Sequence, residues 1–215
     1  MSQLRVEARI HGGITLPYGT LALDGLLAYA VALRMGYGPL GFRDPVPIEI
    51  PIALEPGGRF HLASHSLATF DAHESRFVNR RYPLAEAQML GHDKLRRVHL
   101  AAGPTKSYRI PTTVAFAHGD EIAWACIGDA DPIRELLASI THLGGRRAVG
   151  RGRVAQWRVT PTKSWGPGFP VVRDGRPLRP LPADWPGLSG PRLAYASMTY
   201  PYWDRTREEL CAVPC

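Results

Sequence analysis

Leu143–Thr160 reads LGGRRAVGRGRVAQWRVT, a stretch that runs out of a predicted helix and into a predicted strand. It contains four glycines and five arginines and no acidic residue. Glycine accepts a positive φ and has no Cβ, so a phosphate can approach main-chain N–H groups, while arginine adds charge and a planar fork of donors. The composition therefore predicts a loop that contacts a nucleic-acid backbone. A simpler interpretation also stands, because Gly144 and Gly145 suit a helix C-terminus, and the sequence predicts that a helix ends at Gly144.

The residues before this loop predict a helix and two strands. Asp131 suits an N-cap and Pro132 suits the first helical position. The apolar residues that follow share one helical face and are Ile133, Leu136, Leu137 and Ile140. Further upstream, Thr112–Ala117 and Glu121–Ile127 flank a Gly-Asp turn, which predicts a tight hairpin.

The N-terminal part repeats this order of elements. Gln3–Ile14 alternates apolar and polar residues like a half-buried strand, and Leu23–Arg34 has the apolar spacing of a helix that Gly36 stops. Two short strands, Pro45–Leu54 and Phe60–Phe70, are predicted around a Pro-Gly-Gly turn. The order β-α-β then β-α-β predicts the α+β class with a ferredoxin-like (RRM-like, split βαβ) core. Asp24 is interpreted as structural, because a carboxylate near a helix N-terminus is favoured by the helix dipole.

Between the two halves, residues 71–110 lose apolar periodicity and become basic. Residues 76–109 hold eight lysines and arginines against Glu86 and Asp93, with aromatic residues between them. Cations interleaved with aromatic rings suit single-stranded nucleic acid, whose bases stack on the rings. We therefore predict an inserted arm at about 71–110, with one short helix over Pro83–Leu90; the alternative is a partly disordered surface loop. The arm residues predicted to bind RNA are Arg76, Arg80, Arg81, Arg96, Arg97, Lys106, Tyr108 and Arg109.

The C-terminal quarter differs in composition from the rest. Residues 161–191 contain eight prolines and five glycines, which excludes a central strand or a long helix. Arg192–Thr199 alternates enough for a last strand, and Tyr200, Tyr202 and Trp203 follow as an aromatic group expected in a core or an interface. We therefore predict a core over residues 1–161 that contains the arm, and a Pro/Gly-rich extension over 162–215.

The charge is unevenly distributed. The 215 residues carry a net charge of +7, yet residues 76–109 carry +6 and residues 144–160 carry +5, so the remainder is acidic. Two basic segments on an acidic protein predict a footprint for a polyanion. Three cysteines without a paired pattern predict no disulfide framework and a cytoplasmic location. The sequence shows no signal peptide or membrane-spanning run, and no metal site or cofactor is predicted.

Three pieces of sequence together resemble one family. They are LDGLLAYAV at Leu23–Val31, GGRRAVGRGRV at Gly144–Val154, and PYWDRTREELCAVP at Pro201–Pro214. They resemble the RAMP subunits of CRISPR effector complexes, and most closely the handle-capping, Cas-five-type subunit of type IV systems. The resemblance implies a ferredoxin-like core, a protruding arm, and a place at one end of a ribonucleoprotein, where the subunit grips the 5′ handle of the guide RNA (crRNA).

The resemblance also implies partners and contact residues. The partners are the crRNA and the backbone and large subunits of the effector complex, and contacts with target DNA near the handle stay open. The loop positions that match the family and are predicted to bind RNA are Gly144, Gly145, Arg146, Arg147, Gly150, Arg151, Gly152 and Arg153.

Three functions remain open from the sequence. We expect a non-catalytic crRNA-binding subunit, because no spacing of the eight histidines identifies an acid/base site. The first alternative is a metal-independent endoribonuclease that processes crRNA, since some relatives cut repeat RNA, and His11 and His142 are its candidates. The second alternative is a protein-interaction module that does not bind RNA. A nucleotide-using enzyme is disfavoured, because the glycine-rich loop lacks the Gly-Lys-Ser/Thr ending of a phosphate loop.

Overall fold

The computed structural model describes residues 1–16, 19–37, 48–80, 107–202 and 204–214. The chain divides into two compact units, the first formed by Met1–Ala72 with Ala115–Cys215 and the second by His73–Val114. The described residues form two helices and several small antiparallel sheets, so the predicted α+β class is confirmed. No helix among them is long and apolar enough to cross a membrane.

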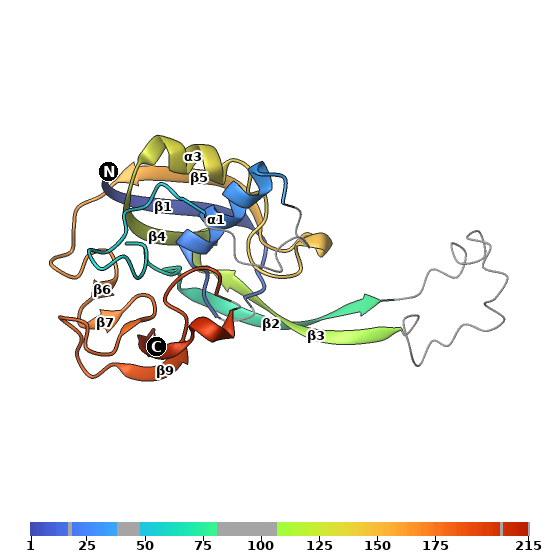
Figure 1. Cartoon of the computed structure of the whole chain (residues 1–215). Coiled ribbons are helices and arrows are strands. Elements are labelled where there is room, and N and C mark those ends of the chain that lie inside the picture. Colours follow the sequence, from blue (N-terminus) through green and yellow to red (C-terminus); the bar gives the residue numbers. More distant parts are fainter. Residues whose placement is uncertain (17–18, 38–47, 81–106, 203, 215) are drawn as a thin grey trace, which may run out of the picture. The chain divides into compact units, whose positions relative to one another are not determined.

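A three-stranded sheet forms the centre of the first unit (Figure 1). Strand β1 (Ser2–His11) lies between β4 (Glu121–Gly128) and β5 (Arg153–Pro161) and is antiparallel to both. The alternation in β1 is the one that the sequence predicts, since Leu4, Val6, Ala8 and Ile10 are buried while most of the residues between them face outward. The pairing of β1 with β5 shifts between Arg9 and Ile10, where β5 carries one extra residue.

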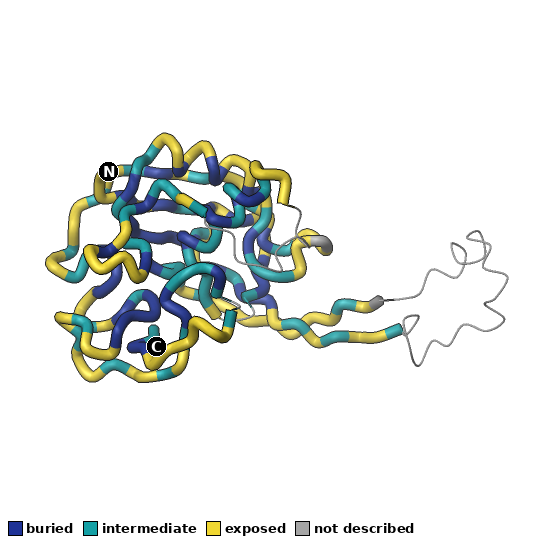
Figure 2. Tube along the Cα trace, viewed as in Figure 1, coloured by how far each residue is buried: buried dark blue, intermediate teal, exposed yellow. Residues whose placement is uncertain are grey.

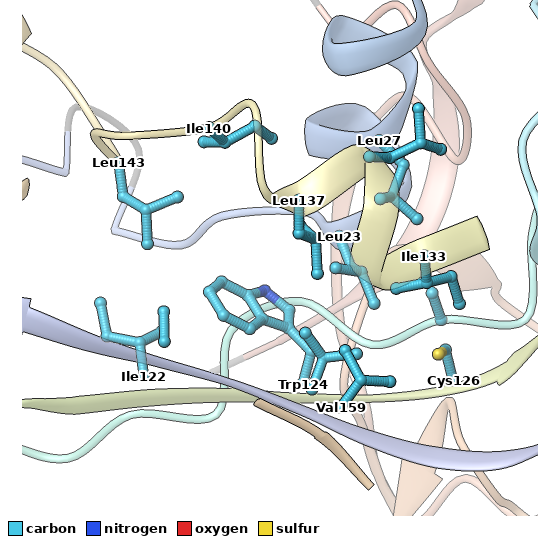
Figure 3. Packing of buried hydrophobic residues seen from close by; sticks show 14 of the residues in the cluster. Leu23, Leu27, Ile122, Trp124, Cys126, Ile133, Leu137, Ile140, Leu143 and Val159 are labelled. Atoms are coloured by element: carbon cyan, nitrogen blue, oxygen red, sulfur yellow. The ribbon is translucent and has the colours of Figure 1, made fainter. Parts of the chain in front are cut away.

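Two helices supply the apolar layer that packs on this sheet. Helix α1 (Leu23–Arg34) is the predicted one, and Gly36 follows it with φ 79°. Helix α3 (Ala130–Leu137) buries Ile133, Leu136 and Leu137, the face that the sequence predicts. Side chains from both helices surround Trp124 of β4 (Figure 3), whose indole N–H donates to the Leu21 carbonyl at 2.9 Å. The buried indole is therefore both packed and hydrogen-bonded.

The ends of α3 differ from the prediction. The helix begins after Asp129 and not after Asp131, and it ends at Leu137, well before Gly144. The segment after α3 instead pairs with the start of β5, because Leu143 N–H donates to the Gly152 carbonyl at 2.8 Å and Val154 N–H donates to Thr141 at 2.8 Å. The prediction that Gly144 ends a helix is thus wrong, because this backbone pairing takes the place of another helical turn.

Residues 48–69 fall within the segment for which the sequence predicts a hairpin of two strands. The turn is present, with a bridge between Leu54 and His61, and the Glu55 carboxylate accepts hydrogen bonds from the N–H groups of Gly57 and Arg59. The described part of this segment forms no regular strand. Its isolated bridges run along β4 and join Ile52 to Gly128, Ala63 to Cys126, and Leu67 to Ala123. The segment therefore occupies the free edge of β4.

The predicted hairpin around His118–Asp120 is also wrong in its pairing. Strand β3 (Tyr108–Ala117) pairs with β2 (Phe70–Arg80), whereas β4 pairs with β1, so the 3-10 turn η1 (His118–Asp120) joins strands of different sheets. The second unit takes in β2 from His73 and β3 up to Val114, together with residues 81–106, which lie outside the described residues. The helix predicted over Pro83–Leu90 falls in that range.

The C-terminal residues build a second, smaller core. Strands β8 (Leu181–Pro182), β10 (Glu209–Val213) and β9 (Arg192–Ala196) form one sheet, and β6 (Val172–Arg173) pairs with β7 (Arg176–Pro177). Strand β9 matches the start of the predicted last strand, while β10 and the 3-10 turn η3 (Arg205–Arg207) were not predicted. Figure 2 colours the chain by burial and shows buried residues both around the central sheet and among the C-terminal strands. The smaller core comprises Phe60, Val171, Val172, Leu181, Met198 and Cys211.

Candidate nucleic-acid interface

The glycine-rich loop has a backbone that only glycine adopts readily at most of its bends. Gly144, Gly150 and Gly152 have φ of 72°, 77° and 64°, and Arg146 also has a positive φ, 59°. A single 3-10 turn, η2 (Arg147–Val149), lies between Arg146 and Gly150. The predicted positive φ is confirmed at three of the four glycines.

Hydrogen bonds hold the base of this loop against the residues that follow β1. The N–H of Gly145 donates to the Thr15 carbonyl at 2.7 Å, and the N–H of Gly152 donates to the Gly13 carbonyl at 3.2 Å. A Cβ on Gly144 would lie 2.4 Å from the Thr15 oxygen, and one on Gly152 would lie 2.1 Å from the Leu143 oxygen. The close packing at Gly144 and Gly152 therefore requires glycine at both positions. The N–H groups of Gly145 and Gly152 already donate hydrogen bonds within the protein, so they are not open to a phosphate.

Three of the four arginines at positions 146, 147, 151 and 153 are exposed. Arg146, Arg147 and Arg153 are exposed, and Arg151 is half-buried. Within the described part of the chain, none of these four forms an ion pair with a carboxylate. Other arginines of the same unit do form such pairs, for example Arg34 with Glu135 at 2.9 Å. The loop therefore presents positive charge that the described acidic side chains do not neutralise.

Two histidines flank an arginine at the base of the loop. In the backbone register, Arg153 pairs with His11 of β1 on one side and with His142 on the other. Cross-strand neighbours have Cα atoms about 5 Å apart, so the Cα atoms of His11 and His142 are about 10 Å apart. The Thr141 hydroxyl lies 3.0 Å from Nδ1 of His142. The two histidines named as candidates from the sequence are thus brought into one row.

His65 and His118 have other surroundings. Burial, reinforced by the Arg179 charge, lowers the pKa of His65 to about 4, so this ring is neutral at pH 7. His118 lies 3.0 Å from a carboxylate oxygen of Asp71. His92 and His99 lie outside the described residues.

The basic residues of the arm belong to the second unit. Arg76 pairs with Glu74 at 2.6 Å, and the Arg109 guanidinium lies 3.6 Å from the centroid of the Phe77 ring. Tyr108 is 37% exposed. The side chain of Arg80, and the whole of Arg81, Arg96, Arg97 and Lys106, lie outside what the structure describes. Arg76 and Arg109, two of the arm residues predicted to bind RNA, thus make internal contacts.

A buried polar cluster was not predicted. Arg179 is fully buried, and its guanidinium donates to Asp24 at 3.1 Å and to the Tyr202 hydroxyl at 3.0 Å. The same group donates to three carbonyls, those of His61, Ala63 and Met198. The Tyr202 hydroxyl in turn donates to Asp24 at 2.8 Å. We call Asp24, Arg179 and Tyr202 the buried triad.

The buried triad explains the charge state of Asp24. Burial alone raises the pKa of this carboxyl, but the Arg179 guanidinium and the Tyr202 hydrogen bond outweigh burial and hold the pKa below its ordinary value. Asp24 is structural, as predicted, although an ion pair and not only the helix dipole accounts for its place. Asp24 and Arg179 are 155 residues apart, and no motif in the sequence joins them. Trp203 lies outside the described residues, and the Tyr202 hydroxyl is held inside the protein.

The central sheet and its two helices make this an α+β protein, and comparison with protein families assigns it to the CRISPR-associated class. The family model of the CRISPR type IV associated protein Csf3 matches residues 72–214. The chain belongs to this family, and the resemblance to type IV CRISPR subunits is confirmed. A comparison with curated proteins gives no match.

Proposed function

We propose that the protein is a non-catalytic crRNA-binding subunit of a type IV CRISPR ribonucleoprotein. It caps the 5′ handle of the guide RNA and anchors the neighbouring backbone and large subunits. One observation carries this proposal: the glycine-rich loop is fastened to the core by backbone hydrogen bonds, yet it exposes arginines that no described carboxylate neutralises. Phosphate groups are the natural partners of such arginines, and release of counterions from RNA favours their association.

The arrangement of the first unit supports a ferredoxin-like core. In a split βαβ fold the first strand lies between the third and the fourth, and the second strand lies at the edge beside the third. Here β1 lies between β4 and β5, and residues 52–67 run along the free edge of β4. Helix α1 follows β1 and helix α3 follows β4, as this fold requires. We accordingly propose a ferredoxin-like core over residues 1–161 with an inserted arm at about 71–110, extended by residues 162–215.

The loop's role is tested with two quadruple variants of equal charge. The loop variant replaces Arg146, Arg147, Arg151 and Arg153 by Ala. The control variant replaces four arginines that pair with carboxylates, which are Arg5, Arg134, Arg173 and Arg207. Both variants lower the net charge by the same amount, so a general electrostatic effect weakens RNA binding equally in both.

The RNA for this test is the RNA that copurifies with the protein from its own cells, sequenced and then synthesised. We expect the affinity of the loop variant to fall far more than that of the control variant. We also expect its salt slope, the change of log affinity with log salt, to become shallower by about 0.7 for each phosphate that the variant no longer binds. Equal RNA affinities of the two variants would refute a specific role of the loop in RNA binding. If no RNA copurifies with the protein, the protein-interaction module is favoured instead.

The endoribonuclease remains a second candidate function, because the structure brings His11, Arg153 and His142 into one row. Metal-independent cleavage needs a base to take the proton of the 2′-hydroxyl, which attacks the phosphate, and an acid to protonate the leaving 5′-oxygen. A pair of histidines that flanks an arginine has the residue types for these steps.

Cleavage is tested with purified protein and a repeat RNA hairpin in the presence of EDTA. We expect no product. A single product that ends in a 2′,3′-cyclic phosphate, and that His11→Ala or His142→Ala slows by about 10²- to 10⁴-fold, would replace the non-catalytic proposal by the endoribonuclease.

A further inference from the structure

A hollow of about 310 Å³ lies beside the glycine-rich loop. Helix α1 supplies one wall, the segment after α3 supplies the floor, and the loop closes one side. The hollow is lined by Tyr29, Leu33, Ser139, Ile140, Thr141, His142 and Arg147. All seven residues belong to the first unit.

The chemistry of this hollow is mixed, and it includes no acidic side chain among the described residues that line it. Tyr29 is half-buried and offers an aromatic ring, and the Arg147 guanidinium carbon lies 5.0 Å from the centroid of that ring. The Thr141 hydroxyl and Nδ1 of His142 are 3.0 Å apart, which restrains the imidazole. Leu33 and Ile140 add apolar surface. The hollow thus combines a flat ring, a cation and hydrogen-bonding groups within one small volume.

These features match a nucleobase. A base has two flat π faces and an edge of donors and acceptors, so it can stack on a tyrosine while hydroxyl and imidazole groups contact its edge. The volume is at the lower end of the range for ligand sites, about 300–1,000 Å³, which suits one base and not a folded protein element. Arg147 belongs both to this hollow and to the exposed arginines of the loop, so a phosphate held by the loop is next to the hollow.

We propose that one nucleotide of the bound guide RNA turns its base into this hollow, where the base stacks on Tyr29 while Arg147 faces its phosphate. This inference rests on the proposed RNA-binding function and assigns Tyr29 as a base-stacking residue. Base–aromatic stacking changes affinity by about 5- to 150-fold per base, and it tolerates any base because each has a π face. The hollow therefore adds affinity at a single nucleotide position and little preference for sequence.

The experiment walks a single abasic nucleotide along the copurified guide RNA, synthesised in full, and measures affinity at constant salt. The proteins are the full-length wild type, Tyr29→Ala, Tyr29→Leu, Tyr29→Phe and, as a matched control, Tyr195→Ala, which removes a tyrosine that is 74% exposed on β9. Tyr29→Leu keeps apolar bulk while removing the π face, and it serves as the test variant if Tyr29→Ala lowers the melting temperature.

We expect one abasic position to weaken wild-type binding about 5- to 150-fold. Tyr29→Ala and Tyr29→Leu should bind intact RNA more weakly by a similar factor and should lose the penalty at that position alone. Tyr29→Phe and Tyr195→Ala should behave like the wild type. If the wild type binds RNA but no abasic penalty depends on Tyr29, the base site is refuted while the proposed function stands. If the wild type binds no RNA, both fail.

Discussion

Replacing Arg179 by Met should destabilise the protein more than replacing an exposed arginine of the first unit. Methionine has a similar length and keeps most of the apolar packing, but it removes the only cation that contacts the buried Asp24 carboxylate among the described residues. It also deprives the His61, Ala63 and Met198 carbonyls of a donor. Breaking a buried ion pair by removing one partner costs about 3–5 kcal/mol.

The size of the effect in a melting experiment follows from the length of the chain. For proteins of about 150–250 residues, 1 kcal/mol shifts the melting temperature by about 2–4 °C. For this chain of 215 residues we therefore expect the melting temperature of Arg179→Met to fall by about 6–20 °C. The matched control is Arg173→Met, because Arg173 is exposed and lies 3.9 Å from Asp174. A surface pair is worth about 0–1 kcal/mol, so the control should melt within about 4 °C of the wild type.

The pH dependence tests the cause of this destabilisation. In the wild type the pKa of Asp24 is below its ordinary value, so this carboxylate stabilises the fold at neutral pH and stops doing so only when the pH falls through that low pKa. In Arg179→Met, burial without the arginine raises the same pKa above its unfolded value. Lowering the pH from 7 to 5 therefore favours the neutral form of Asp24 more strongly in the variant than in the wild type. The difference in melting temperature between Arg179→Met and the wild type should therefore be smaller at pH 5 than at pH 7.

A double variant completes this test. Asp24→Asn together with Arg179→Met removes both charges, so no carboxylate remains buried without a cation, and the double variant should be more stable than Arg179→Met alone. The reasoning is refuted if Arg179→Met melts like Arg173→Met, or if the double variant loses as much stability as the two single changes added together.

Three further predictions concern the loop and the arm. If about five phosphates are contacted, log affinity for single-stranded RNA should fall with log salt at a slope of about −3.5, and a flat salt dependence would contradict the electrostatic basis of binding. Gly152→Ala should lower the melting temperature more than Gly150→Ala. Both glycines have a positive φ, but a Cβ on Gly152 would lie 2.1 Å from a backbone oxygen, whereas a Cβ on Gly150 would have nothing within 4 Å. Equal decreases in melting temperature would show that backbone strain alone, and not the close contact, causes the loss of stability. Replacing residues 74–113 by a short Gly/Ser bridge should leave the first unit folded, since these residues lie within the second unit, and an unfolded product by circular dichroism would count against that division.

The exposure of the loop arginines could be predicted from the sequence, but the contacts of the loop glycines could not. The run of five arginines without acids is a local property of the sequence, and Arg146, Arg147 and Arg153 are exposed in the structure, as such a composition suggests. The use of the glycines could not be predicted, because Gly144 and Gly152 are required by the positions of Thr15 and Leu143, and that close approach exists only in the folded chain. The hollow beside the loop likewise joins Tyr29 to residues more than a hundred positions later, and no local pattern indicates that meeting.

By itself the sequence determined the elements whose residues alternate or repeat locally. These are the buried face of β1, the apolar stripe of α1 and the apolar face of α3. In each of them the spacing of apolar residues within about ten neighbouring positions indicates both the type of element and its buried face. The tertiary structure alone decided the partners. It paired β4 with β1 and not with β3, and it drew residues 141–143 beside β5 in place of another turn of helix. It also buried Arg179 against Asp24, since a buried charge is tolerated only where the fold brings its counter-charge and acceptors together, whatever their distance along the chain.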